Sequence, residues 1–400
     1  MKKMKALVVA PQPFFSPRGT PFSVYYRTLI SSQLGLEIDL LTYGEGQDVD
    51  IPGVRIIRIP RFKMLGNVKI GPSALKLFLD IFIVWKMIWL LIRNRYDILH
   101  AHEESVFVAY FLKPIFRFKL IYDMHSSLPQ QLTNFKFTTS RFLIGLFKRL
   151  EDASLRAADG IITICPDLRD YVDTVITDNE KHYLIENSIF DKVQVVNSES
   201  SDSAKTAEEE KMPSLPDAAK GKKIVIYAGT LEKYQGIDIL VNSFKHVVEK
   251  DPSAFLLVVG GTPDQVALYS QLAQKNNIDS HVHFTGRVPQ VEAKHYNQIA
   301  DVLTSPRSDG TNTPLKVYEQ LASGKPLVAT NIYSHTQVLD DSVCFLVDPK
   351  PEDMARGILS ALEENGDALK KVENAKQLYE DKYSRKVYTR KLEQLLESLS

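Results

Sequence analysis

Cysteine is scarce in this chain: only Cys165 and Cys344 occur among 400 residues. Two cysteines that lie far apart in the sequence argue against a disulfide framework and fit a reducing compartment. Neither cysteine has neighbours at the spacing of zinc ligands. The basic start MKKMK precedes an apolar run that Pro11 ends after a few residues, which indicates a first buried strand and no signal peptide. The sequence therefore predicts a cytoplasmic protein.

The glycine fingerprint of dinucleotide-binding proteins is also missing. The loop after the first strand reads PQPFFSPRGTPFS, without the G-x-G-x-x-G glycines that admit a pyrophosphate. This disfavours a NAD-dependent dehydrogenase. His100 and His102 have the spacing of a zinc-like pair, but no cysteine or third histidine is spaced to complete a metal site. We therefore expect no metal and assign this pair to the lining of a cleft.

The chain carries no net charge, with 49 basic and 49 acidic residues, so total charge indicates no partner. The distribution is uneven, because residues 51–150 hold 16 Lys or Arg against 5 Asp or Glu. A basic stretch of this kind can face anionic lipid, an anionic acceptor or nucleic acid, or form an ordinary solvated surface. We keep membrane-surface contact through residues 75–150 as a hypothesis and expect no nucleic-acid binding.

Short apolar runs alternate with helical segments, which indicates parallel sheets covered on both faces. Two such series predict two Rossmann-like domains, at residues 1–190 and 221–380. Residues 191–220 are rich in Ser, Glu, Lys and Pro and lack aromatics, so they are predicted to be a flexible linker or surface insertion. The predicted strands are Lys5–Ala10, Glu37–Tyr43, Val54–Ile59, Asp97–His102, Leu120–His125, Gly160–Cys165, His182–Glu186, Lys223–Thr230, Phe255–Gly260, Val282–Phe284, Val302–Thr304, Leu327–Thr330 and Cys344–Val347.

The most apolar segment, LKLFLDIFIVWKMIWLLI, runs from Leu75 to Ile92 in a helical pattern that starts at Ser73. A transmembrane helix needs roughly 20 apolar residues with few charges, and this segment is shorter. A helix buried in the domain is favoured over a membrane-surface helix and over a transmembrane span. At about 100° per residue its charges gather on one side: Lys76, Asp80, Lys86 and Arg93.

The stretch from Val302 to Thr330, VLTSPRSDGTNTPLKVYEQLASGKPLVAT, combines a strand end, a polar loop and a short helix. Pro314 is expected at the first helical position and Gly324 just past the helix end. Backbone N–H groups at such a helix N-terminus can bind phosphate or sugar hydroxyls. Lys316 and Glu319 are three residues apart and share one helix face. One can meet an anion while the other accepts from a diol.

His125 ends the predicted strand Leu120–His125, and parallel sheets bind ligands beyond the carboxyl ends of their strands. A polar ring is not needed for the core at that position. We interpret His125 as a functional residue. The alternative is a structural histidine that bonds a backbone carbonyl.

The stretch Val302–Thr330 resembles the C-terminal signature of the retaining family 4 (group 1) glycosyltransferases, which have the GT-B fold. That signature is a loop Glu, seven residues, a second Glu and then A-x-G-x-P. Four positions match, and Thr311 stands in place of the first Glu; the matching residues are Glu319, Ala322, Gly324 and Pro326. The resemblance covers nearly the whole chain outside residues 191–220. It implies an α/β protein of two Rossmann-like domains facing across a cleft, with a C-terminal helix at 383–399 packed on the N-terminal domain.

The resemblance also implies roles for individual residues. Glu319 would grip the ribose diol, His125 would contact the donor sugar near the reaction centre, and Gly19 would lie in a loop over the diphosphate. The family's cationic clamp on the diphosphate is missing, so Lys316 and Arg307 are expected to supply its charge. The other expected donor contacts are Gly229, Thr230, Lys233, Gly261, Arg287, Val288, Asp309, Thr311, Asn312 and Thr313.

The resemblance implies a retaining, metal-independent hexosyltransferase without a cofactor. The donor would be a nucleotide-sugar, UDP-linked in preference to GDP-linked. The acceptor would be a glycan or a lipid-linked acceptor in polysaccharide or glycoconjugate biosynthesis. The alternatives are a sugar-nucleotide epimerase on the same fold and a non-catalytic partner that binds sugar nucleotides. We expect the protein in the cytoplasm, with peripheral attachment to the inner face of the membrane as a further hypothesis.

Overall fold

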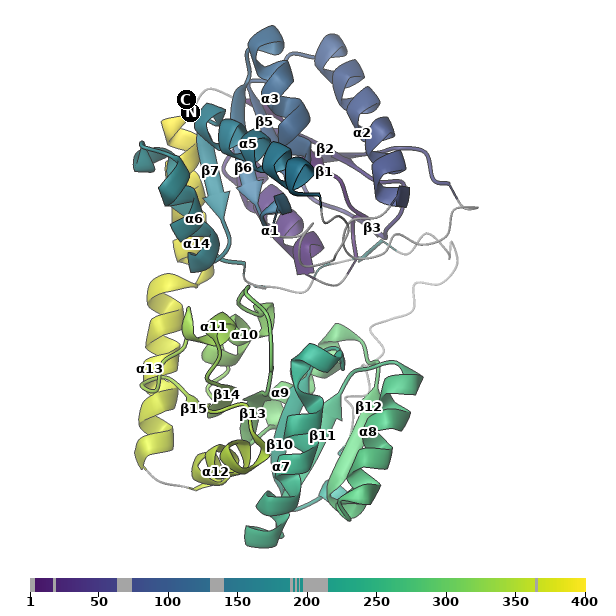
Figure 1. Ribbon diagram of the computed structural model, residues 1–400, viewed down its shortest axis with the longest axis vertical. Coiled ribbons are helices and arrows are strands. Elements are labelled where there is room, and N and C mark those ends of the chain that lie inside the picture. Colours follow the sequence, from purple (N-terminus) through teal and green to yellow (C-terminus); the bar gives the residue numbers. More distant parts are fainter. Residues whose placement is uncertain are drawn as a thin grey trace. The chain divides into compact units, whose positions relative to one another are not determined.

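Strands from two parts of the chain form two parallel sheets, each in its own unit (Figure 1). The computed structural model describes residues 4–16, 19–62, 74–129, 140–187, 190, 193, 195–196, 215–363 and 366–400. One unit comprises Met1–Ser201 with Arg385–Ser400, and the other comprises Asp202–Ser384. The boundary between the units falls inside the predicted linker 191–220, most of which lies outside the described residues.

The first sheet has seven strands in the order β4-β2-β1-β5-β6-β7-β8, all parallel to their neighbours. Most of these strands are short apolar runs, as expected for strands buried on both faces; β1 reads KALVVA. Their bounds are β1 Lys5–Ala10, β2 Glu37–Thr42, β4 Val54–Arg58, β5 Ile98–His102, β6 Lys119–Met124, β7 Gly160–Thr163 and β8 His182–Leu184. A separate antiparallel pair joins β3 (Asp48–Val49) to β9 (Val195–Val196).

Helices cover both faces of this sheet. Because strand side chains alternate between faces, Val8 and Ile121 share a core with α1 (Gly19–Gln33) and α14 (Arg385–Ser398). Leu7 and Leu120 point to the opposite face. That face is covered by α2 (Ala74–Arg93), α3 (Ser105–Phe116), α5 (Arg141–Ala157) and α6 (Pro166–Val175).

The second sheet has six parallel strands in the order β12-β11-β10-β13-β14-β15. Its strands are β10 Lys223–Ala228, β11 Ala254–Val259, β12 Val282–Gly286, β13 Val302–Ser305, β14 Leu327–Thr330 and β15 Phe345–Val347. One face packs against α7 (Ile237–Lys250), α8 (Pro263–Lys275) and α12 (Pro351–Leu362). The other packs against α9 (Gln290–Ile299), α10 (Leu315–Ala322) and α13 (Gly366–Lys382), and a short α11 (Tyr333–Thr336) follows β14.

Each sheet reverses its strand order once, between β1 and β5 in the first and between β10 and β13 in the second. At such a reversal the connections on either side leave to opposite faces, so a crevice opens beyond the carboxyl ends of the two strands. The two Rossmann-like sheets predicted from the sequence are therefore confirmed. Their topology also indicates where a ligand is expected: beyond the carboxyl ends of β1 and β5 and of β10 and β13.

Differences from the sequence prediction are confined mostly to element ends. Every predicted strand is present, but Thr230, for example, belongs to the loop after β10. Pro314 is the N-cap of α10 instead of its first helical residue. The last helix begins at Arg385, slightly later than the predicted 383.

The helix α2 is strongly apolar, but only one side of it is buried. Leu79, Ile83 and Met87 join the core, whereas Ile81 and Trp85 are 66% and 62% exposed. The interpretation of this segment as a helix buried in the domain therefore holds for one face only. Among the residues that the structure describes, no helix is long and apolar enough to cross a membrane.

The helix α14 completes the core of the first unit, although it follows the second unit in the sequence. Leu392, Leu395 and Leu396 are buried in the same cluster as α1 and the central strands. Gly160 in β7 leaves the space that Leu395 fills, because a Cβ on this glycine would lie 2.5 Å from the Leu395 Cδ1 atom.

We expect Leu395→Ala to lower the free energy of unfolding of the first unit by about 2–5 kcal/mol, because it leaves a cavity at this contact. Gln394→Ala, on the exposed side of the same helix, is the control and should change it by less than about 0.5 kcal/mol. Both tryptophans, Trp85 and Trp89, lie in α2. Urea unfolding followed by tryptophan fluorescence therefore measures this unit alone. Equal effects of the two substitutions would contradict the packing of α14.

Candidate active site

Two loops meet at the reversal of strand order in the second sheet. One follows β10 and ends at Gly236, and the other follows β13 and begins at Pro306. Gly236, with φ of +68°, lies so close to the second loop that a Cβ on it would be 1.9 Å from the Pro306 carbonyl oxygen. The backbone N–H of Ser308 donates to the carbonyl of Tyr234 over 2.9 Å. These contacts hold the two loops as one surface beyond the strand ends.

Arg307 fixes the shape of the second loop. Its Nε donates to the Asp309 carbonyl over 2.6 Å, and its Nη1 donates to the Asn312 carbonyl over 3.2 Å. The guanidinium also lies 5.2 Å from the centroid of the Tyr234 ring, which links it to the first loop. Burial lowers the pKa of Arg307, but a guanidinium keeps its proton at neutral pH. Arg307 therefore places a fixed positive charge in this loop.

Lys316 lies in the first turn of α10, and its ammonium is buried without a hydrogen-bond partner among the described residues. Its Nζ is 4.0 Å from the centroid of the Tyr227 ring. Burial, with a smaller contribution from the charge of Arg307, lowers the pKa of Lys316 to about 7. A buried ammonium without a counter-ion is unfavourable, so this position favours an anion supplied by a ligand.

Glu319 follows one helical turn after Lys316, on the same face of α10. Burial raises its pKa to about 7, and the charge of Lys294 opposes that shift. The hydroxyl of Thr313, just before the helix, is also buried without a partner among the described residues. The start of α10 thus presents a hydroxyl, an ammonium and a carboxyl group within seven consecutive residues, 313–319.

The loop after β11 comes equally close to the loop after β10. A Cβ on Gly260 would lie 2.0 Å from the Gly229 carbonyl oxygen, so only glycine fits there. The Tyr227 hydroxyl donates to the Thr230 carbonyl over 2.6 Å. Gly229 and Thr230 are therefore held beside Tyr227, whose ring contacts the Lys316 ammonium.

Other predicted donor contacts lie apart from this group or on its exposed rim. Arg287 and Val288 follow β12, the edge strand, which β11 separates from β10. Gly19 begins α1 in the first unit. Gly261 follows Gly260, and a Cβ on it would lie 2.5 Å from the Leu231 Cδ1 atom. The exposed positions are Lys233, Asp309 and Thr311. None of these assignments has a contact that tests it, so they stay predictions.

His335 is fully buried beneath this site, and no sequence pattern pointed to it. Its Nε2 lies 2.9 Å from the Ser305 hydroxyl, and its Nδ1 lies 2.8 Å from the Thr330 carbonyl oxygen. Burial lowers its pKa to about 4, so the ring is neutral at pH 7. His335 therefore joins the ends of β13 and β14 and supports the loop that carries Arg307. Its nearest sequence neighbours have no distinctive pattern.

The first unit contains a fully buried ion pair at the corresponding end of its sheet. Arg27 in α1 donates from Nε to Asp123 Oδ2 in β6 over 2.8 Å and from Nη2 to the Ile185 carbonyl over 3.1 Å. The guanidinium lies 5.2 Å from the Tyr388 ring centroid in α14. Burial alone would raise the pKa of Asp123, but Arg27 and the nearby imidazoles hold it well below its usual value. Asp123 is therefore a permanent carboxylate.

Three histidines surround this carboxylate. His100 Nε2 lies 3.1 Å from Asp123 Oδ2, His125 Nε2 lies 3.4 Å from Asp123 Oδ1, and His102 Nδ1 lies 3.0 Å from His125 Nε2. Burial lowers the pKa of His125 to about 4 and that of His102 well below its usual value. Both rings are therefore neutral at pH 7. The contact with His102 fixes the position of the His125 ring.

The sequence argument that no further ligand joins His100 and His102 missed Asp123, which the neighbouring strand supplies. Ligand atoms of these three residues lie within 4.8 Å of one another. Asp123 already binds Arg27, however, so a divalent cation would add charge beside a buried guanidinium. The side chains present are therefore better matched to a hydrogen-bonded cluster than to a metal centre.

Comparisons with known proteins assign a family to each unit. The glycosyl transferase 4-like domain matches residues 31–188, and the glycosyl transferases group 1 family matches residues 208–378. The first match lies within the N-terminal unit and the second lies within the other unit. The second match includes both loops and the helix α10.

Similar proteins cover most of the chain. Phosphatidyl-myo-inositol mannosyltransferase of Mycobacterium tuberculosis is 22% identical over 372 residues, 90% of this chain and 88% of that protein. Sucrose-phosphate synthase of Thermosynechococcus elongatus has a TM-score of 0.72 at 19% identity, over 99% of both chains. The Anabaena protein HepE, solved in complex with UDP, has a TM-score of 0.70 at 15% identity, over 99% of this chain and 100% of that chain. These likenesses in structure establish the fold.

We expect Gly236→Ala to disrupt the contact between the two loops, because its Cβ would overlap the Pro306 carbonyl. Gly221→Ala is a matched control: Gly221 has nearly the same φ, +72°, but a Cβ there would meet nothing within 4 Å. The backbone strain is thus shared, and only the steric contact differs. The thermal unfolding temperature of Gly236→Ala should lie below that of Gly221→Ala, with a difference in free energy of about 1–3 kcal/mol. Equal unfolding temperatures would refute the close approach.

Proposed function

Because this chain belongs to the group 1 glycosyltransferases and has the GT-B fold, we propose that it moves a hexose from a nucleotide-sugar to a glycan or lipid-linked acceptor. We propose a UDP-linked donor in preference to a GDP-linked one. The reaction would proceed with retention at the anomeric carbon and without a metal ion.

The observation that carries this proposal is the unpaired Lys316 ammonium at the start of α10. It lies where the strand order reverses, at a helix N-terminus whose free N–H groups attract anions. A diphosphate would supply the missing counter-charge. Arg307, held by its loop at a fixed place, would add a second positive charge without reorganisation during the reaction.

The remaining groups fit the other parts of such a donor. Glu319, one turn further along α10, would accept hydrogen bonds from the ribose hydroxyls once it is ionised. Thr313 offers a buried hydroxyl without a partner among the described residues, and the exposed polar loop around Asp309 and Thr311 would face the sugar. Departure of the diphosphate is the step that these positive charges would assist, since negative charge develops on its bridging oxygen.

His125 is proposed to hydrogen-bond the donor sugar. Its ring is neutral at pH 7, so one ring nitrogen can donate and the other can accept. The contact of its Nε2 with His102 holds the imidazole in place. With retention, the departing phosphate would take the acceptor proton, so no separate enzymic base is assigned.

A panel of UDP-, GDP- and ADP-linked sugars tests the function. We expect one sugar nucleotide to raise the unfolding temperature and to donate its sugar to a glycolipid or glycan acceptor, with the transferred anomer read by NMR. Chelators should not reduce the rate. Isomerisation of the donor without an acceptor would indicate an epimerase instead. Binding without transfer or hydrolysis over the acceptor panel would indicate a non-catalytic partner.

Glu319→Gln should abolish stabilisation by both UDP and uridine, because both contain the ribose that Glu319 is proposed to bind. Glu352→Gln, an exposed carboxylate at the start of α12, is the control and should leave both ligands unaffected. Thermal shift with each ligand measures the effect. Retained stabilisation by uridine in Glu319→Gln would remove this residue from the ribose site.

Lys316 should make diphosphate binding depend on pH. Its pKa of about 7 in the free protein means that it loses charge as the pH rises above neutrality, and binding of an anion restores the proton. The affinity for UDP relative to uridine should therefore fall by up to about tenfold per pH unit above about pH 7. Glu319 acts on the ribose of both ligands, so its own titration cancels in this ratio. Arg307 stays charged throughout.

Lys316→Met should weaken UDP but not uridine at neutral pH, and the ratio of the two affinities should no longer change with pH. Isothermal titration calorimetry gives both affinities. The same pH slope in wild type and Lys316→Met would show that the slope arises elsewhere.

A further inference from the structure

Exposed apolar side chains are concentrated on three neighbouring helices of the first unit. Of the 15 large hydrophobic residues that are exposed in the described part of the chain, 11 lie on α2, α3 or α5. The helix α3 contacts both α2 and α5, so the three lie side by side over one face of the sheet (Figure 1). We call their outer surface the α2–α3–α5 face. Its residues are Leu77, Phe78, Ile81, Trp85, Trp89, Ile92, Phe111, Ile115, Phe142, Leu143 and Leu146.

On α2 these residues form a continuous stripe. Apart from the adjacent Leu77 and Phe78, they recur every three or four positions, which places them along one side of the helix, opposite the buried Leu79, Ile83 and Met87. The six residues span positions 77–92, a length of about 22 Å along the helix axis. The apolar side of a helix in a globular protein usually faces the core, whereas this stripe lies on the side of α2 that points away from it. The exposed stripe therefore indicates a surface that is covered by an apolar partner.

Basic residues lie among these apolar side chains. Lys86 Nζ is 4.3 Å and the Arg93 guanidinium is 5.2 Å from the centroid of the Trp89 ring, so two cations flank one exposed aromatic. On α5, Arg141 and Arg149 are exposed beside the apolar first turns. The excess of basic residues noted in the sequence thus extends over this face. An occupant must be both apolar and negatively charged.

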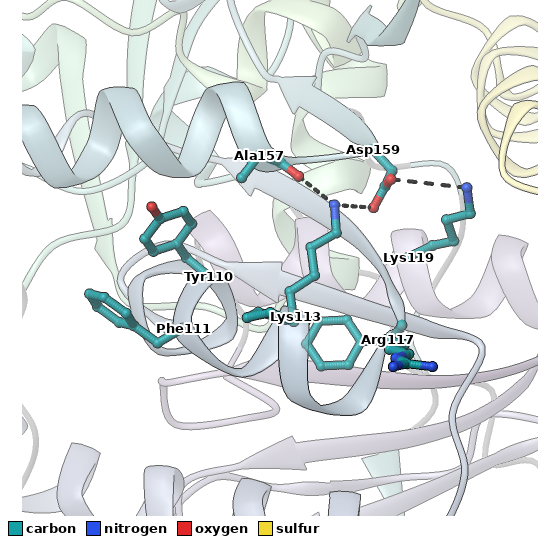
Figure 2. A pocket seen from close by; sticks show the side chains of 9 residues that line it. Tyr110, Phe111, Lys113, Arg117, Lys119, Ala157 and Asp159 are labelled. Carbon is teal, nitrogen blue, oxygen red and sulfur yellow. Dashed lines mark hydrogen bonds and ion pairs between the residues drawn. The ribbon is translucent and has the colours of Figure 1, made fainter.

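A pocket of about 580 Å³ at the end of α3 shows the same combination (Figure 2). Tyr110 and Phe111 line one side of it. Lys113 is neutralised, because its Nζ lies 2.7 Å from Asp159 and also donates to the Ala157 carbonyl. Arg117 makes no such pair with an acidic side chain among the described residues and points away from Asp159. Its charge is available to an anionic group at the edge of the face.

We propose that the α2–α3–α5 face docks on the surface of an anionic lipid bilayer. The apolar stripe and the two tryptophans would enter the interfacial layer, and the arginines would meet lipid phosphates. The α2 helix would lie in the plane of the membrane, since its polar flank and the rest of the unit remain on the aqueous side. This gives the proposed function a partner: it brings the enzyme to the surface where a lipid-linked acceptor resides.

A second copy of the chain is a poorer occupant of the same surface. In a twofold dimer the face would pack against itself, so Lys86, Arg93 and Arg149 would meet the same cations of the other copy. Like charges across an interface disfavour that association. A bilayer with anionic lipids provides negatively charged headgroups for these cations and a hydrocarbon region for the apolar side chains. Charge complementarity thus selects the membrane.

Co-sedimentation of the full chain with vesicles tests this proposal. We expect binding to vesicles of phosphatidylglycerol and phosphatidylcholine in equal amounts, much weaker binding to phosphatidylcholine alone, and release at high salt, where charges are screened. Failure of the wild-type protein to bind the anionic vesicles would overturn the proposal.

Two sets of variants separate the apolar and charged contributions. The double variant Ile81→Ser with Trp85→Ser should weaken binding at least about tenfold, because two apolar side chains no longer enter the interface. Its control is Leu268→Ser with Leu369→Ser, which changes residues of similar exposure in the second unit, 59% and 67%. This control should bind like wild type. An equal loss in the control would refute a localised face.

The triple variant Arg93→Gln, Arg117→Gln and Arg149→Gln should bind anionic vesicles about 100-fold more weakly, at roughly 1 kcal/mol per cation near an anionic surface. Its control replaces three exposed lysines of the second unit: Lys245→Gln, Lys250→Gln and Lys275→Gln. If the apolar double variant unfolds at a lower urea concentration than wild type, the arginine variant still tests the proposal. Equal losses in the triple variant and its control would refute the proposal.

Two further readouts distinguish the remaining outcomes. Sedimentation velocity without lipid should give a monomer; a dimer that Ile81→Ser with Trp85→Ser dissociates would assign the face to self-association instead. Thermal shift with UDP should be unchanged in the face variants, since they are remote in sequence from Lys316 and lie in the other unit. If the protein binds vesicles but UDP does not raise its unfolding temperature, the proposed UDP-linked donor is wrong and the proposed docking surface still holds.

Discussion

The reversal of strand order between β10 and β13 is the constraint on which the donor site depends. Strands on either side of this point send their connections to opposite faces of the sheet, so no helix covers the ends of the two strands. The loops that remain must be stabilised by each other. Gly236 lies against Pro306, Tyr234 accepts from Ser308, and Arg307 bonds two carbonyls of its own loop. The helix α10 begins directly after this loop in the chain, with Lys316 in its first turn.

The two units treat buried charge in opposite ways. Arg27 and Asp123 neutralise each other completely, and removing either partner would leave an uncompensated charge at a cost of about 3–5 kcal/mol. Such a pair maintains the structure whether or not a ligand is present. The Lys316 ammonium lies against the Tyr227 ring and has no hydrogen-bond partner among the described residues, and burial lowers its pKa. Burying the Lys316 ammonium without a counter-ion costs free energy, and a bound anion would offset that cost. This contrast separates the structural cluster from the binding group.

The sequence was informative where local periodicity decides the outcome. Apolar runs located the strands, and the three-residue spacing of Lys316 and Glu319 placed them on one helix face. It failed where residues far apart in the sequence become neighbours. Asp123 reaches His100 and His102 through the register of β5 and β6, and Arg27 arrives from a helix some 100 residues earlier. His335 gave no signal because its partners are a hydroxyl and a carbonyl on two other strands. The sequence favoured a buried α2 over a membrane-surface helix for a related reason: hydropathy records how apolar a helix is, but not how much of it the domain covers.

The position of α14 has a consequence for how the protein is made. The ribosome synthesises the first sheet before the second unit, but Leu392, Leu395 and Leu396, which cover one face of that sheet, follow the second unit in the sequence. During translation of the second unit, the apolar side chains that pack against these leucines therefore lack their cover. The second unit can complete its own core in that interval, because its strands and covering helices are contiguous in the chain. The unit that emerges first from the ribosome is thus the one that finishes folding last, and chaperones that bind nascent apolar surfaces would meet it in that unfinished state.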